Sequence, residues 1–154
     1  MFPPDPATTL GYWSHMAAHR YFDLLMERMK PSGLDRGFYA LMLIAEHDGC
    51  LSQQELAARL HVDKATMVRT LDHLSERGYV ERSSCPGDRR KHQLKLLPAG
   101  KPVVAEIRAT CEALNQAAFT GVDAAAQEQF LATLSAVLNT LAAAKETPGP
   151  VNLL

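Results

Sequence analysis

The stretch LSQQELAARLHVDKATMVRTLDHLSERGYVERSSCPGDRRKHQLKLLPAGK, residues 51–101, decides how the whole 154-residue chain is interpreted. Up to Gly78 its apolar residues recur every three or four positions, which is the spacing of amphipathic helices. After Gly78 polar and apolar residues alternate, as they do in half-buried strands, and the sequence Pro86-Gly87-Asp88 is a turn signal. The stretch therefore predicts two short helices followed by a β-hairpin.

Local signals predict where these two helices begin and end. Ser52 and Glu55 have the spacing of a capping box at the start of the first helix. Asp63 is a good N-cap for the second helix, and its charge suits the positive end of the helix dipole. Gly78 stands just past the last turn, where a left-handed residue ends many helices. The apolar stripe of the second helix consists of Met67, Leu71 and Leu74.

Polar residues of this stretch gather at two places. The tip of the hairpin carries three adjacent cations, Arg89, Arg90 and Lys91, which suit two backbone phosphates or a minor groove. A solvated hairpin tip is the alternative interpretation of the same charges. The face of the second helix opposite the apolar stripe carries hydrogen-bond donors and hydroxyl groups. Its members are Lys64, Thr66, Arg69, Thr70 and His73.

The motifs of residues 51–82, the sequence GDRRKHQLKL and the sequence LPAGK resemble the MarR family of bacterial transcription regulators. The resemblance extends more loosely over nearly the whole chain. It implies a mainly α fold with a small β-hairpin wing, in one MarR-like domain over residues 1–154. Within it, a winged helix-turn-helix covers residues 35–97, and dimerisation helices cover residues 8–30 and 98–144.

The helices outside the central stretch also have sequence signals. Thr8 or Thr9 can cap a helix that runs to about Met29, and Asp35 is expected to cap a buried helix over residues 38–45. The first and last helices carry more apolar surface than one small winged helix needs. A two-fold interface is the commonest way to bury such surface, and the resemblance likewise implies a homodimer. A monomer that folds these helices onto itself is the alternative.

A two-fold dimer places two such second helices in successive major grooves, about 34–36 Å apart. The resemblance therefore implies double-stranded DNA with an inverted repeat as the partner. Val68 stands where many relatives have a small hydroxylated residue and could contact only a thymine methyl group. In the wing, the resemblance implies that Asp88 orients Arg89 or Arg90 into the minor groove. The predicted DNA-binding residues are Ser52, Gln53, Gln54, Lys64, Thr66, Val68, Arg69, His73, Asp88, Arg89, Arg90 and Lys91.

The resemblance also implies regulation by a small molecule. Members of the family usually repress genes near their own and are released from DNA by a small, often aromatic or phenolic compound. Such a ligand would favour a spacing of the two DNA-reading units that does not fit the grooves. The residues expected to line its site are Trp13, Met16, His19 and Tyr39. Core or interface positions are the alternative interpretation of all four.

Two other functions remain as alternatives. A redox-responsive regulator of the same fold would use Cys85, which is close in sequence to Arg89 and Arg90. A winged-helix module that binds another protein would show little salt dependence, whereas DNA binding releases counterions and depends strongly on salt. The only close group of metal-ligating residues is Glu46, His47 and Cys50, and we predict no metal site.

The overall charge of −1 is unevenly distributed. Residues 52–101 hold ten Lys and Arg against six Asp and Glu, a balance of +4, whereas the rest of the chain holds six against eleven, a balance of −5. This asymmetry is expected of a protein that presents a DNA-reading face on an otherwise acidic body.

Other function classes lack their motifs in this sequence. No run of about 18 apolar residues predicts a membrane span, and the first residues lack the basic and apolar regions of a secretory signal. Three widely spaced cysteines do not form a disulfide framework, so a reduced, cytoplasmic protein is expected. We find no G-x-S-x-G, H-E-x-x-H, glycine-rich phosphate loop or C-x-x-C. We therefore predict no enzyme, no catalytic residue and no cofactor.

Overall fold

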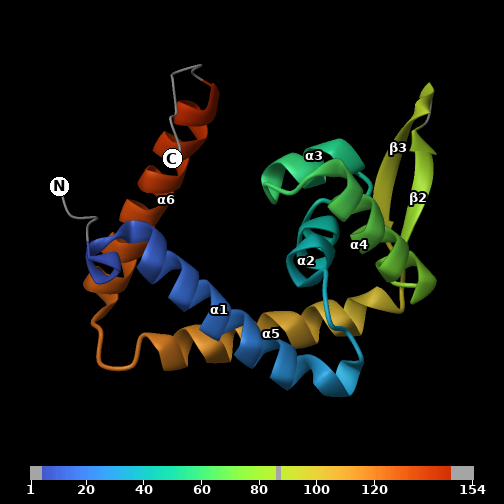
Figure 1. The fold of residues 1–154 in the computed structure, drawn as a ribbon. Coiled ribbons are helices and arrows are strands. Elements are labelled where there is room, and N and C mark those ends of the chain that lie inside the picture. The colour runs from blue at the N-terminus through green and yellow to red at the C-terminus, as the bar shows by residue number, and fades with distance from the viewer. Residues whose placement is uncertain (1–4, 86–87, 147–154) are drawn as a thin grey trace. The chain divides into compact units, whose positions relative to one another are not determined.

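The computed structural model describes residues 5–85 and 88–146, without the side chains of residues 6, 84–85, 88–92 and 145–146. The chain forms two compact units, residues 1–114 and 115–154. The elements in chain order are η1 (Pro6–Thr8), α1 (Leu10–Met29), η2 (Lys30–Ser32), α2 (Phe38–Glu46), β1 (Leu51–Ser52), α3 (Gln53–Arg59), α4 (Lys64–Glu76), β2 (Val80–Cys85), β3 (Asp88–Leu96), α5 (Gly100–Ala118) and α6 (Ala124–Glu146) (Figure 1).

The first unit contains a winged helix. β2 and β3 form an antiparallel hairpin, and the short strand β1 pairs with the other edge of β3, so that the strand order is β1-β3-β2. Leu94 of β3 pairs with Leu51 on one side and Arg82 on the other. The helices α2, α3 and α4 lie beside this hairpin (Figure 1). The predicted fold class, mainly α with a small β-hairpin wing, is confirmed.

Helix starts follow the predicted caps at several places. The Ser52 side chain accepts a hydrogen bond from the Glu55 amide, and the Glu55 carboxylate accepts from the Ser52 amide, so the capping box is formed. Asp63 caps α4 by accepting from the amide of Thr66. Thr9 caps α1. These predictions were local in sequence, and all of them are confirmed.

The predicted cap of α2 is wrong. The N-cap residue of α2 is Gly37, which has φ of 79° and makes no side-chain cap hydrogen bond. Because Asp35 lies two residues before this left-handed turn, its carboxylate does not meet the first amides of the helix. It binds instead to Arg36 and to His73 of α4. The stretch from Gly33 to Gly37 therefore connects η2 to α2 and lies outside both helices.

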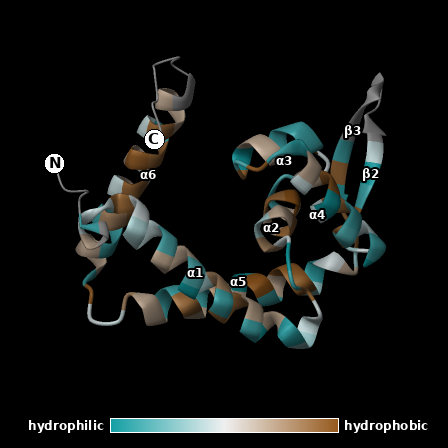
Figure 2. Ribbon diagram, in the orientation of Figure 1, coloured by the Kyte–Doolittle hydropathy of each residue, from teal (hydrophilic) through white to brown (hydrophobic). Residues whose placement is uncertain are grey.

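The core of the first unit joins α1, α2, α3, α4, the sheet and α5. Met67, Leu71 and Leu74 of α4 are fully buried, which confirms the predicted stripe. The helix α2 contributes Phe38 and Leu41 among others, and it is coloured as hydrophobic in Figure 2. Removing such side chains from water is the main favourable contribution to folding. The winged helix thus shares one apolar core with α1 and α5.

The base of the wing packs closely against the start of α5. The helix begins at Gly100, and a Cβ atom added there would lie 2.8 Å from both the Tyr79 carbonyl oxygen and Leu96 Cδ1. Pro98 lies two residues before the helix. Pro102 is the third helical residue, where the amide has no partner within the helix anyway.

The second unit contains the end of α5 and the helix α6. Asp123 caps α6 by accepting a hydrogen bond from the Ala126 amide. The ring of Phe119 meets the ring of Phe130 edge to face at 5.9 Å. Large apolar side chains of α6 are nevertheless more than half exposed within this unit. They are Phe130, Leu131, Leu138 and Leu141.

Candidate nucleic-acid interface and ligand pocket

The first turns of α4 present an ordered polar face. Asp63 accepts hydrogen bonds from the amide and the hydroxyl of Thr66 at 2.9 and 2.6 Å. The Thr66 hydroxyl oxygen in turn accepts from Nη2 of Arg69 at 3.1 Å. Since a hydroxyl has only one hydrogen, that of Thr66 is engaged with Asp63. Lys64 and Arg69 are exposed on this face, and Thr66 orients Arg69.

The Asp63 carboxylate is the anchor of this arrangement. Its hydrogen bond from the Thr66 hydroxyl, together with the bond from the Thr66 amide, holds the pKa of Asp63 below its ordinary value. Asp63 therefore stays ionised near neutral pH, where it also faces the positive end of the α4 dipole. The sequence predicted the cap but not the continuation from Thr66 to Arg69.

The next turn of α4 connects to the wing. Val68 is half-buried and lies one turn after Lys64 and one turn before Asp72. The Asp72 carboxylate forms an ion pair with Arg82 of β2 at 2.8 Å. This pair joins α4 to the first strand of the hairpin. Sequence reasoning missed it because Arg82 lies ten residues away in another element.

His73 is occupied by residues of its own chain. Its side chain is 19% exposed, and Nε2 lies 3.1 Å from Asp35 Oδ1. The same Nε2 lies 3.2 Å from Nε of Arg77. A ring nitrogen carries either a hydrogen or a lone pair, so Nε2 can donate to Asp35 or accept from Arg77 at any one time. A DNA contact by His73, which the sequence predicted, would compete with both.

The other predicted DNA contacts lie at the start of α3 and in the wing. The Ser52 hydroxyl donates to Glu55 within the capping box, so its hydrogen is already used. Gln54 is exposed, whereas Gln53 is half-buried. The side chains of Asp88, Arg89, Arg90 and Lys91, and that of Cys85, lie outside the described part of the structure. Their roles in DNA binding and redox sensing stay predictions.

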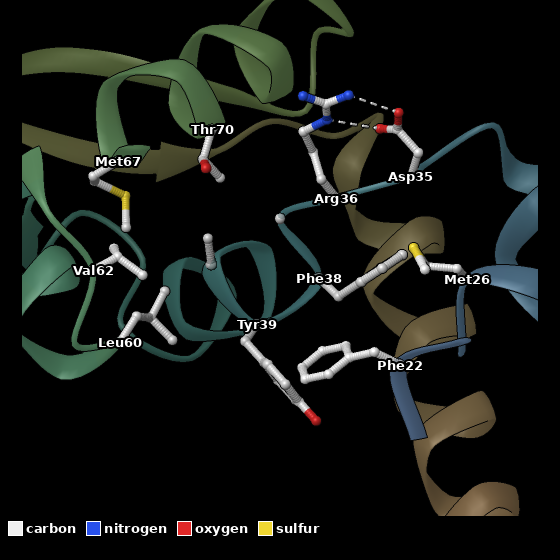
Figure 3. Close-up of a pocket in the computed structure, with 12 residues that line it drawn as sticks. Phe22, Met26, Asp35, Arg36, Phe38, Tyr39, Leu60, Val62, Met67 and Thr70 are labelled. Carbon is white, nitrogen blue, oxygen red and sulfur yellow. Dashed lines mark hydrogen bonds and ion pairs between the residues drawn. The ribbon is translucent and has the colours of Figure 1, made fainter. Parts of the chain in front are cut away.

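A cavity of about 420 Å³ lies in the first unit among α1, α2 and the residues from Leu60 to Thr70. Figure 3 shows the rings of Phe22 and Tyr39 facing each other at one end, and they meet edge to face at 5.7 Å. Most of the lining is apolar, which is typical of small-molecule sites. The other apolar residues that line it are Met26, Phe38, Ala40, Leu60, Val62 and Met67.

Asp35 and Arg36 form an ion pair at one edge of the cavity, and the phenol of Tyr39 lies away from it (Figure 3). Arg36 donates to Asp35 through Nε at 3.2 Å and through Nη2 at 3.0 Å, as the dashed lines in Figure 3 show. The bond from Arg36 holds the pKa of Asp35 below its ordinary value, and the same contact raises the pKa of Arg36. Burial raises the pKa of Tyr39, so its phenol is neutral at physiological pH.

Of the four residues predicted to bind a ligand, Tyr39 lines the cavity and the other three do not. Trp13 is 60% exposed and donates from its indole nitrogen to the Ala7 carbonyl. Met16 is half-buried elsewhere on α1. His19 stacks on a neighbouring histidine and lies 3.6 Å from Asp23. A later part of α1 lines the cavity instead.

The described residues contain neither a metal-binding cluster nor a membrane-spanning helix. Among them, no group of three His, Cys, Asp or Glu side chains could hold a metal ion. No helix in residues 5–85 or 88–146 is long and apolar enough to cross a membrane. Cys50 is exposed and Cys111 is buried, and both are free thiols.

The chain is similar to known proteins in its winged helix and in its fold. A model of the MarR family matches residues 35–91, which contain α2, α3, α4 and most of the wing. Many solved structures share the fold. MarR is 23% identical with a TM-score of 0.78, and the match covers 93% of this chain and 97% of MarR.

Two other similar structures contain bound molecules. The structure of CouR from Rhodococcus jostii bound to p-coumaroyl-CoA is 23% identical, with a TM-score of 0.75 and coverage of 88% of this chain and 95% of CouR. A complex of S. aureus MepR with DNA is 18% identical, with a TM-score of 0.77 and coverage of 89% and 99%. The winged helix thus matches the model of the MarR family, and most of the chain shares the fold of the solved structures.

Proposed function

We propose that the protein is a dimeric regulator that binds an inverted repeat in double-stranded DNA and is released from it by a small aromatic ligand. The observation that carries the DNA-binding part is the outer face of α4, where Asp63 and Thr66 hold the exposed Arg69. An arginine oriented in advance can bind guanine O6 and N7 with both arms of its guanidinium. The DNA complex of the similar protein MepR supports this assignment.

The residues of the DNA interface have different roles in this proposal. Lys64 and Arg69 contact base edges or phosphates, and Val68 contacts a thymine methyl group. Gln54 contacts the backbone from the start of α3, where Ser52 serves as a cap. In the wing, Asp88 orients Arg89 or Arg90, which enters the minor groove. The excess of cations in residues 52–101 supplies the electrostatic attraction.

Dimerisation is supported by apolar side chains that each unit leaves exposed. On α1 these include Leu10, Trp13 and Leu24, and on α6 they include Leu131 and Leu138. Contiguous exposed apolar side chains mark interaction surfaces, and a second copy of the chain is the commonest partner for such a surface. The first and last helices thus place two winged helices for an inverted repeat. Repression follows when the bound dimer excludes other proteins from the DNA.

DNA binding is tested by selecting duplexes from a randomised pool and measuring affinity for the winning sequence at two salt concentrations. We expect an inverted repeat with half-sites about one helical turn apart and a strong dependence on salt. Arg69→Ala should cost about 1–3 kcal/mol of binding free energy and relax the preference at one base. Arg69→Lys is the matched control, because it keeps the charge but loses the planar fork.

No enrichment over random duplex at either salt concentration would contradict the DNA-binding proposal. Enrichment with the same affinity and the same base preference in Arg69→Ala would leave DNA binding intact but remove Arg69 from the base contacts. A variant Arg69→Lys that keeps the salt dependence and loses the base preference would support the proposed role of the guanidinium.

The cavity beside α2 is the proposed effector site. Its apolar lining and the paired rings of Phe22 and Tyr39 suit an aromatic compound, since rings pack well edge to face. The similar protein CouR has p-coumaroyl-CoA bound, which supports a small-molecule effector. Trp13, Met16 and His19 lie outside the cavity and are left out of this proposal.

An environment-sensitive dye tests the cavity directly. Anilinonaphthalene sulfonate should fluoresce more strongly with the protein and should weaken DNA binding at concentrations that saturate the signal. Tyr39→Ala should reduce the dye affinity. Met42→Ala, which shortens an α2 side chain that does not line the cavity, is the matched control. Equal loss of dye binding in the two variants would contradict the assignment.

A further inference from the structure

Residues 33–37 lie along α4 and are called the strap. A Cβ atom added at Gly33 would lie 3.3 Å from Nη1 of Arg77. Two residues after Gly33 on the strap, the carboxylate of Asp35 contacts the side chain of His73 of α4. A Cβ atom added at Gly37 would lie 3.1 Å from Cγ2 of Thr70 and 3.4 Å from the side chain of Leu74.

These contacts form a regular register. Steps of two residues along the strap correspond to steps of three or four residues back along α4, which is the spacing of one helix face. The strap therefore passes from Arg77, the residue just after α4, to Thr70 within α4, antiparallel to the helix. Leu34, which is 1% exposed, anchors the strap in the core between these contacts. The Asp35 to His73 contact is the charged member of the set.

The strap is also a wall of the cavity. Asp35, Arg36 and Gly37 line it from one side, and Met67 and Thr70 of α4 line it from another. Thr70 belongs to both features, because its methyl group lies against Gly37 while the residue lines the cavity. Any molecule that fills the cavity therefore meets the strap and α4 together.

We propose that the strap sets the position of α4 on DNA, with His73 as a positioning residue held by Asp35, and that it transmits the contents of the cavity to DNA affinity. This inference rests on the proposed DNA-binding function. It changes the role of His73, which the sequence placed among the DNA contacts. His73 acts through Asp35, and its own ring nitrogen stays within the chain.

A double-mutant cycle tests the positioning role. Affinity for the selected duplex is measured at several salt concentrations for the parent, Asp35→Ala, His73→Ala and the double variant. We expect each single variant to lose roughly threefold to tenfold in affinity, on the order of one solvent-exposed hydrogen bond. The double variant should lose no more than either single one. The salt slope should not change, since no phosphate contact is removed.

A direct DNA contact by His73 gives the opposite pattern. In that case His73→Ala alone would weaken binding and lower the salt slope by about 0.9. Asp35→Ala would leave affinity equal or raise it, because it removes an acid near DNA. That pattern, or additive losses, would overturn the positioning role. His47→Ala is the control, since Nε2 of His47 lies beside an arginine, Arg59, as that of His73 lies beside Arg77, but His47 is on neither the strap nor α4.

The dye tests the transmission to DNA. Saturating anilinonaphthalene sulfonate should weaken DNA binding of the parent and should weaken that of Asp35→Ala much less, while dye fluorescence shows that both proteins are occupied. The same ratio of affinities in both proteins would overturn the transmission through Asp35. Absence of dye binding would overturn the effector site and the transmission with it, and the cycle would still decide the positioning role. Absence of DNA selection by the parent would instead refute the proposed function.

Discussion

The winged helix and the helix α6 bury their apolar residues to very different extents. In the winged helix, the stripe of α4 is fully buried, and the polar face opposite it is tied by Asp63 and Asp72. On α6 comparable leucines remain more than half exposed within their own unit. The core of the first region is completed by α1 and α5 of the same chain. The apolar stripe of α6 has no such cover within its own unit.

The largest expected effect is on assembly. Leu138→Asp places a charge on the apolar stripe of α6, where Leu138 is 58% exposed, and should prevent the dimer from forming. A monomer loses the second half-site, so its affinity for an inverted repeat should fall roughly hundredfold or more. Sedimentation and DNA binding measure the two consequences.

The matched control for assembly is Asn139→Asp. It adds the same charge at the adjacent, exposed position of α6 without entering the apolar stripe. A dimer that survives Leu138→Asp as well as it survives the control would remove α6 from the interface. The winged helix should keep its thermal unfolding transition in both variants, because its core does not use these residues.

The next effect is on the stability of the winged helix itself. Gly37→Ala forces a side chain into a backbone with φ of 79° and pushes a methyl group against Thr70. We expect the free energy of unfolding to fall by about 2–4 kcal/mol, from backbone strain and the close contact together. Gly49→Ala is the control, because Gly49 has φ of 74° but open space around it. Equal losses in both variants would mean that the approach to Thr70 costs nothing.

A smaller effect concerns DNA recognition by the ordered face of α4. Thr66→Val removes the hydroxyl that joins Asp63 to Arg69 but keeps the shape of the side chain. We expect roughly fivefold weaker binding to the selected duplex, from about 1 kcal/mol of lost orientation, with little change in thermal stability. Thr66→Ser restores the hydroxyl and should recover most of the affinity. No recovery in Thr66→Ser would show that the hydroxyl is not the cause.

The smallest effect is on the pH dependence of stability. The pKa of Asp35 is held below its ordinary value, chiefly by the hydrogen bond from Arg36. Its contribution to stability is therefore complete above the ordinary aspartate pKa and is lost as the pH falls through the lower value of the folded state. Because the group is exposed, we expect well under about 1 kcal/mol. Thermal unfolding of the parent and Asp35→Asn should converge under acidic conditions, and a difference that grows on acidification would contradict this sign.

Residues that act on near neighbours were predicted well from the sequence. The capping box of Ser52 and Glu55, the cap at Asp63 and the stripe of α4 depend on spacings of a few residues, and all are present. His73 was placed with the DNA contacts because it lies one turn from Arg69 on a polar face. Its partner Asp35 is distant in sequence, and no periodicity could reveal that pair.

The residues of α1 that line the cavity could likewise not be predicted from local sequence spacing. Trp13 and Met16 are as apolar as Phe22 and Met26, and all four lie on α1. Which part of α1 faces α2 is decided by packing between elements, so sequence spacing could not separate them. Gly33 and Gly37, on either side of Asp35, were the one sequence signal of a close approach, because glycine often permits contact with another element.

Gly100 allows the start of α5 to pack directly against the base of the wing, where Tyr79 and Leu96 lie. With a rise of 1.5 Å per residue, the part of α5 up to residue 114 extends about 21 Å from that point. A tilt of only about 5° at Gly100 would displace its far end by roughly 2 Å over that length. The missing side chain at residue 100 thus leaves the helix in direct contact with Tyr79 and Leu96, so the orientation of α5 is linked to that of the wing.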